Sequence, residues 1–197
     1  KITFCTILAF CFILLAGCNK KNKEIIIDDV KMNTLLVKND GTVQAAFIEA
    51  FDKDYYNSTE FNDYVTQEIN KYNSETGVDA IALSSLEIRD KSMVLLLKYT
   101  DLEHYSKSIQ TDAIVMNLSD LPNSEVILPD TFYSAKNKEV VTKDTVMESE
   151  KCKVLIVNEG INVLVDGKVQ YYSNGQLLGS SELQTAPEGQ TIIIYKP

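Results

Sequence analysis

Few residues of the types that carry enzyme chemistry occur in this chain of 197 residues. It has one histidine, His104, and four cysteines, of which Cys5 and Cys11 lie within an apolar N-terminal run. A catalytic thiol needs a neighbouring histidine, cation or helix N-terminus to lower its pKa. Cys152 opens another apolar run, so we expect it to occupy a core or edge position on a strand. Cys18 is the cysteine whose surroundings indicate chemistry.

Small residues precede that cysteine in the sequence Leu15-Ala16-Gly17-Cys18, after the uncharged apolar run Ile2–Leu15. The run is shorter than the about 20 apolar residues that span a bilayer. It follows Lys1, as the apolar region of an export signal follows its charged region. The pattern resembles the lipobox of bacterial lipoproteins. An ordinary signal peptide, or a membrane helix with a chance cysteine, is the alternative.

The resemblance implies that residues 1–17 are a signal peptide and that Cys18 carries a diacylglycerol thioether, with acyl groups such as palmitate. The protein would then be anchored on the extracytoplasmic side of the cell membrane, because two acyl chains give stable retention. Residues 18–31 form the predicted tether. Its lysines, from Lys20 to Lys23, either contact anionic headgroups or are simply solvated. Ile25-Ile26-Ile27 predicts an early strand or a docked linker.

An excess of acidic residues bounds the classes of partner. Without residues 1–17 the chain keeps 18 basic and 28 acidic side chains, a formal charge of −10. This charge argues against nucleic acid, which needs a basic surface, and it suits solubility or a cationic partner. A chain of about 180 residues buries enough surface for one domain. With Cys18 lipidated, Cys152 has no cysteine partner, so we expect no disulfide.

The sequence lacks the residues or the spacing that other catalytic, metal and cofactor sites require. His104 lies in a predicted short helix, and no Gly-x-Ser-x-Gly elbow is present. One histidine and one free thiol do not supply the four ligands of zinc. Asp52, Asp54 and Asn57 alternate as calcium ligands do, but the glycine and glutamate of an EF-hand loop are missing. We interpret them as turn and helix-cap residues, and expect no catalytic residue, metal or cofactor.

Two tyrosine pairs, Tyr55-Tyr56 and Tyr171-Tyr172, are candidate ligand-binding residues. Adjacent tyrosines offer a stacking surface for sugars or peptides. Neighbouring side chains on a strand face opposite ways, so one of Tyr171 and Tyr172 should be in the core and the other exposed. The absence of tryptophan weakens the case for a carbohydrate ligand.

The N-terminal half predicts two hairpins that alternate with two helices. Asp40-Gly41 between apolar runs favours a hairpin over residues 34–51. Asn57 and Glu60 have the spacing of a capping box, and Phe61, Tyr64, Val65, Ile69 and Tyr72 then share one helical face up to Gly77. A second hairpin over 80–99 turns at Asp90-Lys91. Thr100 and Glu103 form another capping box before a short helix over 102–109, and a strand follows at 113–116.

Residues 117–150 predict loops with one or two short strands. The remainder is rich in strands, which we expect at 153–157, 161–165, 168–172 and 191–195, with Asp166-Gly167 closing a third hairpin. The predicted fold is α+β: antiparallel sheets built from hairpins, one longer and one shorter helix packed on one face, and a β-rich C-terminal meander. Residues 32–197 form one domain, with a sub-boundary left open near 120–150.

The segment from Asp52 to Ile109 resembles a group of uncharacterised lipoproteins from Firmicutes. The shared features are a helix ending in Lys71-Tyr72-Asn73 before Gly77, strands with Leu86-Glu87-Ile88 and Leu97-Lys98-Tyr99, and an acidic-capped helix with Tyr105. The resemblance implies a location and no activity.

The sequence favours a non-enzymatic, membrane-anchored domain that binds a ligand or partner at the cell envelope. The alternative is a surface hydrolase that acts on cell-wall or glycan material through paired carboxylates. A substrate-binding lipoprotein of a transporter is disfavoured, because such proteins usually need two α/β lobes and more residues.

Overall fold

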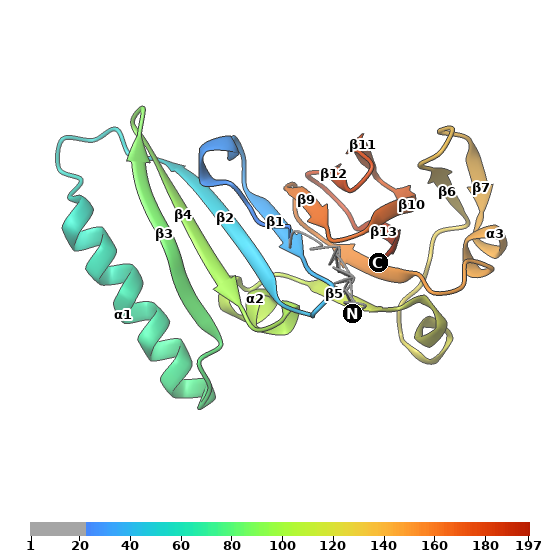
Figure 1. Cartoon of the computed structure of the whole chain (residues 1–197), viewed down its shortest axis with the longest axis horizontal. Coiled ribbons are helices and arrows are strands. Elements are labelled where there is room, and N and C mark those ends of the chain that lie inside the picture. Colours follow the sequence, from blue (N-terminus) through green and yellow to red (C-terminus); the bar gives the residue numbers. More distant parts are fainter. Residues whose placement is uncertain (1–22) are drawn as a thin grey trace, which may run out of the picture.

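Two β-sheets packed face to face make up the protein, with a long helix along one end (Figure 1). The computed structural model describes residues 23–197. The predicted signal peptide 1–17 and the predicted lipidation site Cys18 lie outside the described residues. The α+β fold and its mainly antiparallel sheets confirm the predicted fold class.

Seven strands form the first sheet, sheet A. Across the sheet they are β11 (Gly175–Gly179), β12 (Glu182–Thr185), β9 (Asn162–Val165), β1 (Thr34–Val37), β2 (Val43–Ala50), β4 (Ser92–Tyr99) and β3 (Ile81–Arg89). Neighbours are antiparallel except β1 and β9, which run parallel. The hairpins β1–β2 and β3–β4 are those predicted, so the Asp40-Gly41 and Asp90-Lys91 turns are correctly placed.

Six antiparallel strands form sheet B. In order they are β5 (Ala113–Asn117), β8 (Lys153–Val157), β13 (Thr191–Lys196), β10 (Lys168–Ser173), β6 (Thr131–Ser134) and β7 (Val140–Thr142). The helices are α1 (Ser58–Thr76), α2 (Leu102–Ile109), α3 (Lys143–Met147) and the 3-10 turns η1 (Ile27–Asp29) and η2 (Leu118–Asn123).

The main core lies between the inner faces of the two sheets. Leu35 of β1 and Val163 of β9 pack there with Leu155 of β8 and Ile193 of β13, and all four are at most 1% exposed. The C-terminal region is β-rich, as predicted, and its strands divide between both sheets. Successive residues of a strand point to opposite faces of its sheet, and in the central strands β1, β8 and β13 nearly all residues on both faces are buried.

Two smaller apolar clusters cover the outer faces. Residues from η2 to α3, including Leu118, Phe132 and Val146, pack on the outer face of sheet B. Ile25 and Val30 pack on the outer face of sheet A. We call residues 23–30 the N-terminal strap, because this part of the predicted tether lies on sheet A and contains the turn η1.

Hydrogen bonds fix the strap at several points. The Lys23 ammonium donates to Ser181 Oγ at 2.6 Å, and the amide of Ile25 donates to Gln44 Oε1 at 2.8 Å. The Arg89 guanidinium donates to the Ile27 carbonyl at 2.6 Å. Burial lowers the pKa of Lys23, although Glu182 and Asp166 act in the opposite direction.

Helix α1 begins and ends where the sequence predicts. The Asn57 side chain accepts hydrogen bonds from the amides of Thr59 and Glu60, which satisfies two otherwise unpaired donors. Gly77 takes the left-handed conformation, φ +73°, and its amide donates to the Asn73 carbonyl. Glycine adopts this φ without steric cost.

Helix α2 begins one residue later than the predicted capping box implied. Its N-cap is Asp101, whose carboxylate accepts the amide of His104 at 2.8 Å. Thr100 is not the cap. Aspartate and threonine side chains both accept such a bond. Because the two residues are adjacent here, the sequence left the first residue of α2 uncertain by one position.

The predicted third hairpin, at Asp166-Gly167, does not form. β9 joins sheet A and β10 joins sheet B, so the turn connects two sheets. A Cβ on Gly167 would lie 2.4 Å from the Lys196 carbonyl oxygen. Glycine is therefore needed there for close backbone approach rather than for the positive φ of a hairpin turn.

Candidate functional site

An open apolar groove of about 420 Å³ lies between α1 and α2 on the inner face of sheet A. Apolar and aromatic side chains make up most of its lining, with a few polar groups at the rim. The lining residues are Phe47, Tyr64, Val65, Glu68, Ile69, Lys71, Tyr72, Glu75, Ile81, Leu95, Leu97, Tyr99, Ser108 and Ile109. This volume is within the range of about 300–1,000 Å³ that is usual for small-molecule sites. We call it the α1–α2 groove.

The floor of the groove consists of β2 and β4, which are interior strands of sheet A. Phe47 on β2 and Leu95 on β4 are register partners, and both are only half-buried. Leu95 has strand partners on both sides, in β2 and in β3, whereas β2 pairs with β1 only over Val43–Ala46. A ligand on this face of the sheet therefore meets side chains at the floor, and β4 offers it no free backbone edge.

Helix α1 forms one wall and is attached mainly near its C-terminal end. The Asn73 side chain donates to the Ile81 carbonyl at 2.9 Å and accepts the Ile81 amide at 3.0 Å. Tyr72 Oη lies 3.0 Å from His104 Nδ1 on α2. Of the nineteen residues of α1, Val65 alone is buried. A helix with so few buried residues leaves Phe47 and Leu95 of the neighbouring sheet only half-buried; Figure 1 shows α1 running alongside β3.

Polar groups join the two helical walls at one end of the groove. His104 bridges Tyr72 and Asp101, whose Oδ2 is 4.0 Å from His104 Nε2. Next to them, burial raises the pKa of Tyr99 to about 12, and burial beside Glu159 raises that of Tyr105. These neutral tyrosines provide packing and hydrogen bonds, because their hydroxyls stay protonated over the usual pH range.

An aromatic cluster continues the apolar surface beyond the N-terminal end of α1. It comprises Phe51, Tyr55, Tyr56, Phe61 and Tyr64, and neighbouring ring centroids are 4.8–6.5 Å apart. Tyr64 belongs to both the cluster and the groove lining. Tyr55 is 78% exposed and Tyr64 is 58% exposed, so the rings are available to a ligand.

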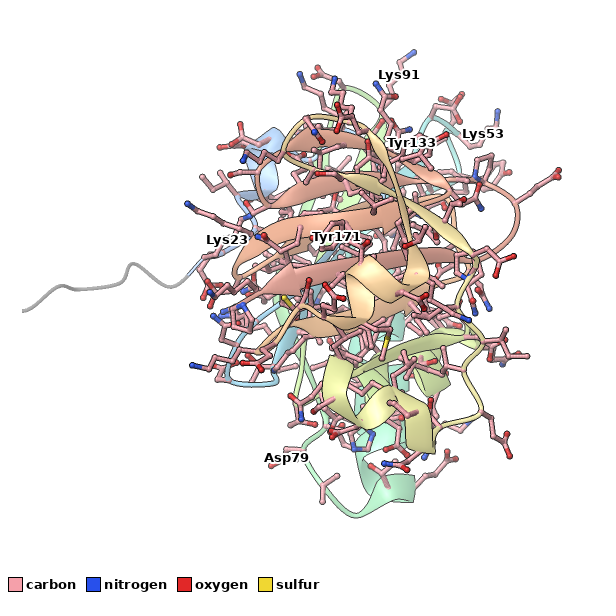
Figure 2. All side chains as sticks on the ribbon, turned by 90° about the vertical axis from the view of Figure 1, so that its right-hand side faces the viewer. Lys23, Lys53, Asp79, Lys91, Tyr133 and Tyr171 are labelled. Carbon is pink, nitrogen blue, oxygen red and sulfur yellow. The ribbon has the colours of Figure 1, made fainter. Side chains whose placement is uncertain are left out.

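The two predicted tyrosine pairs lie in different places. Tyr55 and Tyr56 belong to the aromatic cluster beside the groove. Tyr172 is buried between the sheets, whereas Tyr171 is half-buried on the outer face of β10. Figure 1 places β10 and α1 at opposite ends of the molecule, and Figure 2 shows Tyr171 over sheet B, which faces the viewer. The pairs do not form one surface.

The other residues considered as candidates for a site have structural roles. Cys152 is 5% exposed and packs under η2, and burial raises the pKa of its thiol. Within residues 23–197, no group of three or more His, Cys, Asp or Glu side chains is arranged to hold a metal ion. Asp52 and Asp54 lie in the loop before α1, and Asn57 caps that helix.

Sequence reasoning did not assign Phe47, Ile69, Leu95 and Ile109 to a site. Their signal was the ordinary alternation of apolar residues, which predicts burial for all of them. Whether these residues are fully or half-buried depends on the tertiary packing of α1 and α2, which the hairpin β3–β4 separates in the sequence.

No protein-family model matches this chain, and neither curated proteins nor solved structures show significant similarity to it. Among the helices of residues 23–197, none has the length and hydropathy of a membrane span.

Proposed function

We propose that this protein is a membrane-anchored extracytoplasmic lipoprotein that binds an apolar ligand in the α1–α2 groove, without catalysing a reaction. The groove is the observation that carries the binding proposal. It combines an open apolar floor, three lining tyrosines and a flanking aromatic cluster with exposed rings. Exposed apolar surface of this kind usually marks a binding site.

The pattern at Leu15-Ala16-Gly17-Cys18 supports the anchor. The N-terminal strap adds to this support, because the chain joins the folded domain within five residues of Cys18. We expect Cys18→Ala to release the protein from membranes or to leave it unprocessed, as measured by membrane fractionation and lipid labelling. Unchanged lipid labelling of the variant would refute the assignment.

The alternative, a carboxylate-dependent hydrolase, has a weaker basis in the groove. Glu68 and Glu75 line it, and seven residues along a helix separate them by about 10.5 Å, which is beyond the roughly 6.5–9.5 Å of an inverting pair. Both are solvent-exposed. Neither therefore occupies the apolar environment that keeps a catalytic carboxylic acid protonated.

A fluorescence titration tests groove binding. The protein is the mature chain, residues 18–197, with Cys18→Ser, which retains all three apolar clusters. The probe is the neutral dye Nile red, whose emission rises in apolar surroundings. We expect Ile69→Lys, at the groove wall, to weaken binding by roughly tenfold or more, since it places a charge in the apolar site.

Ile127→Lys is the matched control, because Ile127 is 86% exposed and lies near β6, away from the groove. Circular dichroism confirms that both variants are folded. Equal binding by the wild type and Ile69→Lys would exclude the groove as the site.

A further inference from the structure

Most of the net negative charge of the protein lies in the two segments that contain the helices of the α1–α2 groove. The segments 51–79 and 100–112 comprise the loop before α1, both helices and their flanking turns, and they carry ten acidic residues and three lysines. Their net charge of −7 compares with −9 for the whole chain. The negative charge is thus concentrated in the segments that flank the apolar site, and the charged side chains among the lining residues are Glu68, Lys71 and Glu75.

This charge is extended and largely unpaired. Helix α1 has nineteen residues, a length of about 28 Å, and bears acids along that length. Glu68 and Glu75 at the groove rim form no ion pair with any described residue. A small amphiphile with one cationic head group would neutralise a small part of such a field. An elongated partner with several positive charges would neutralise much more of it.

The strands of the groove floor indicate which of two common modes of peptide binding is available, strand addition or docking of an amphipathic helix. β4 already pairs on both sides, and the groove lies over the face of the sheet, so an extended peptide on this floor cannot add to β4 as a new strand. An amphipathic helix needs no backbone partners, because its apolar face lies on a groove through side chains at i, i+3, i+4 and i+7. Beyond the groove, the aromatic cluster offers rings for further apolar contacts and for cation–π contacts with lysine or arginine.

We propose that the α1–α2 groove binds a basic amphipathic helix of a partner protein, with apolar side chains on Phe47 and Leu95 and lysines or arginines facing the acidic walls. This inference rests on the groove binding proposed above and specifies the occupant. The opposite charge of the two surfaces also makes association faster at low salt.

Fluorescence anisotropy with labelled synthetic peptides tests the proposal on the mature Cys18→Ser chain. The first peptide has leucines at helical i, i+3, i+4, i+7 spacing and lysines elsewhere, over about five turns. The second has the same composition with the leucines spread around the helix. The third replaces lysine with glutamate. We expect the first peptide to bind at least roughly tenfold tighter than the other two, and binding to weaken as salt screens the charges.

Two double variants of equal charge change separate local from general electrostatics. Glu68→Lys with Glu75→Lys should weaken the first peptide by roughly tenfold or more. Glu125→Lys with Glu188→Lys changes exposed acids outside the groove, and it should leave affinity within about twofold.

The outcomes also distinguish this inference from groove binding itself. If Nile red binds in an Ile69-dependent way but the first two peptides bind equally, the occupant is not an amphipathic helix and the inference fails alone. Equal loss in both double variants would show non-specific attraction and also overturn it. Tighter binding of monomeric dodecyltrimethylammonium than of the first peptide would assign the groove to a small cationic amphiphile instead. If neither dye nor peptide binds, both proposals fail.

Discussion

One side chain, that of Asn73, makes two hydrogen bonds to backbone groups and so positions α1 against the sheet. The Asn73 amide pairs with both backbone groups of Ile81, just before β3 joins the sheet. The Asn73 side chain thus pairs with Ile81 in the way that the backbone of a neighbouring strand would. It fixes the height of the helix above the floor and hence the width of the groove.

We predict that Asn73→Ala lowers the free energy of unfolding by about 1–3 kcal/mol, because it leaves backbone groups of Ile81 without partners. Urea denaturation measures the change. Asn70→Ala is the matched control, since Asn70 is exposed on the same helix and its replacement should change stability by no more than about 0.5 kcal/mol. Equal effects of the two substitutions would contradict this role of Asn73.

Tyr195 gives the fold a dependence on alkaline pH. Its ring is fully buried, and its hydroxyl has no hydrogen-bond partner within residues 23–197. Burial raises the pKa of Tyr195 to about 12, with a smaller effect from Asp166. The folded state therefore holds this proton more tightly than the unfolded chain. The corresponding stability is complete below the unfolded pKa of about 10 and is lost as the pH rises toward 12.

We predict that between pH 10 and about 12 the wild type loses roughly 1.4 kcal/mol of stability per pH unit through this group. Tyr195→Phe should show a shallower decline, and little loss at neutral pH because no hydrogen bond is broken. Tyr64→Phe, an exposed tyrosine, provides the comparison. A Tyr195→Phe slope that matches the wild type would disprove the assignment.

At the scale of elements, local signals predicted hairpins and helices well and connections between sheets poorly. Asn57, Gly77 and the Asp40-Gly41 turn act through neighbouring residues, so sequence spacing was sufficient. Asp166-Gly167 has the same local pattern as a hairpin turn. Its role depends on close contact with the distant end of β13, which local spacing does not reveal.

The short strands β11 and β12 were missed for a related reason. Each has four or five residues, and two glycines bound β11, which local rules assign to turns. Gly175 is required because a Cβ there would lie 2.9 Å from the Gln184 carbonyl oxygen. The groove escaped prediction in the same way, since periodicity predicts which face is apolar and not whether another element covers it.

One side chain from β3 makes several of the hydrogen bonds that hold the N-terminal strap. Arg89 donates to the carbonyls of Ile27 and Val30 and pairs with Asp28 at 2.9 Å. We predict that Arg89→Ala speeds amide hydrogen exchange in residues 23–31 while leaving β8 and β13 protected, because the strap opens locally. Lys168→Ala, at an exposed lysine of sheet B, should leave strap exchange unchanged. Unchanged protection of the strap in Arg89→Ala would show that its other contacts hold it without Arg89.

At the scale of the molecule, the proposed anchor and the proposed site lie on different parts of the domain. Five residues from Cys18 to Lys23 span at most about 17–18 Å when extended, which would hold the edge formed by Lys23, Val165 and Ser181 near the membrane. The acidic α1 lies at one end of the long axis, and α2 lies nearer the middle (Figure 1). They would remain accessible to a partner at the cell envelope.

The central claim is that the α1–α2 groove is the binding site, and NMR chemical-shift mapping tests it most directly. Methyl and amide signals of the mature Cys18→Ser chain are followed as Nile red is added. The account predicts that the largest shifts cluster at Phe47, Ile69, Leu95 and Ile109, with little change around Ile127 and Tyr133. Shifts centred on Ile127 and Tyr133, or an unchanged spectrum at saturating dye, would contradict it.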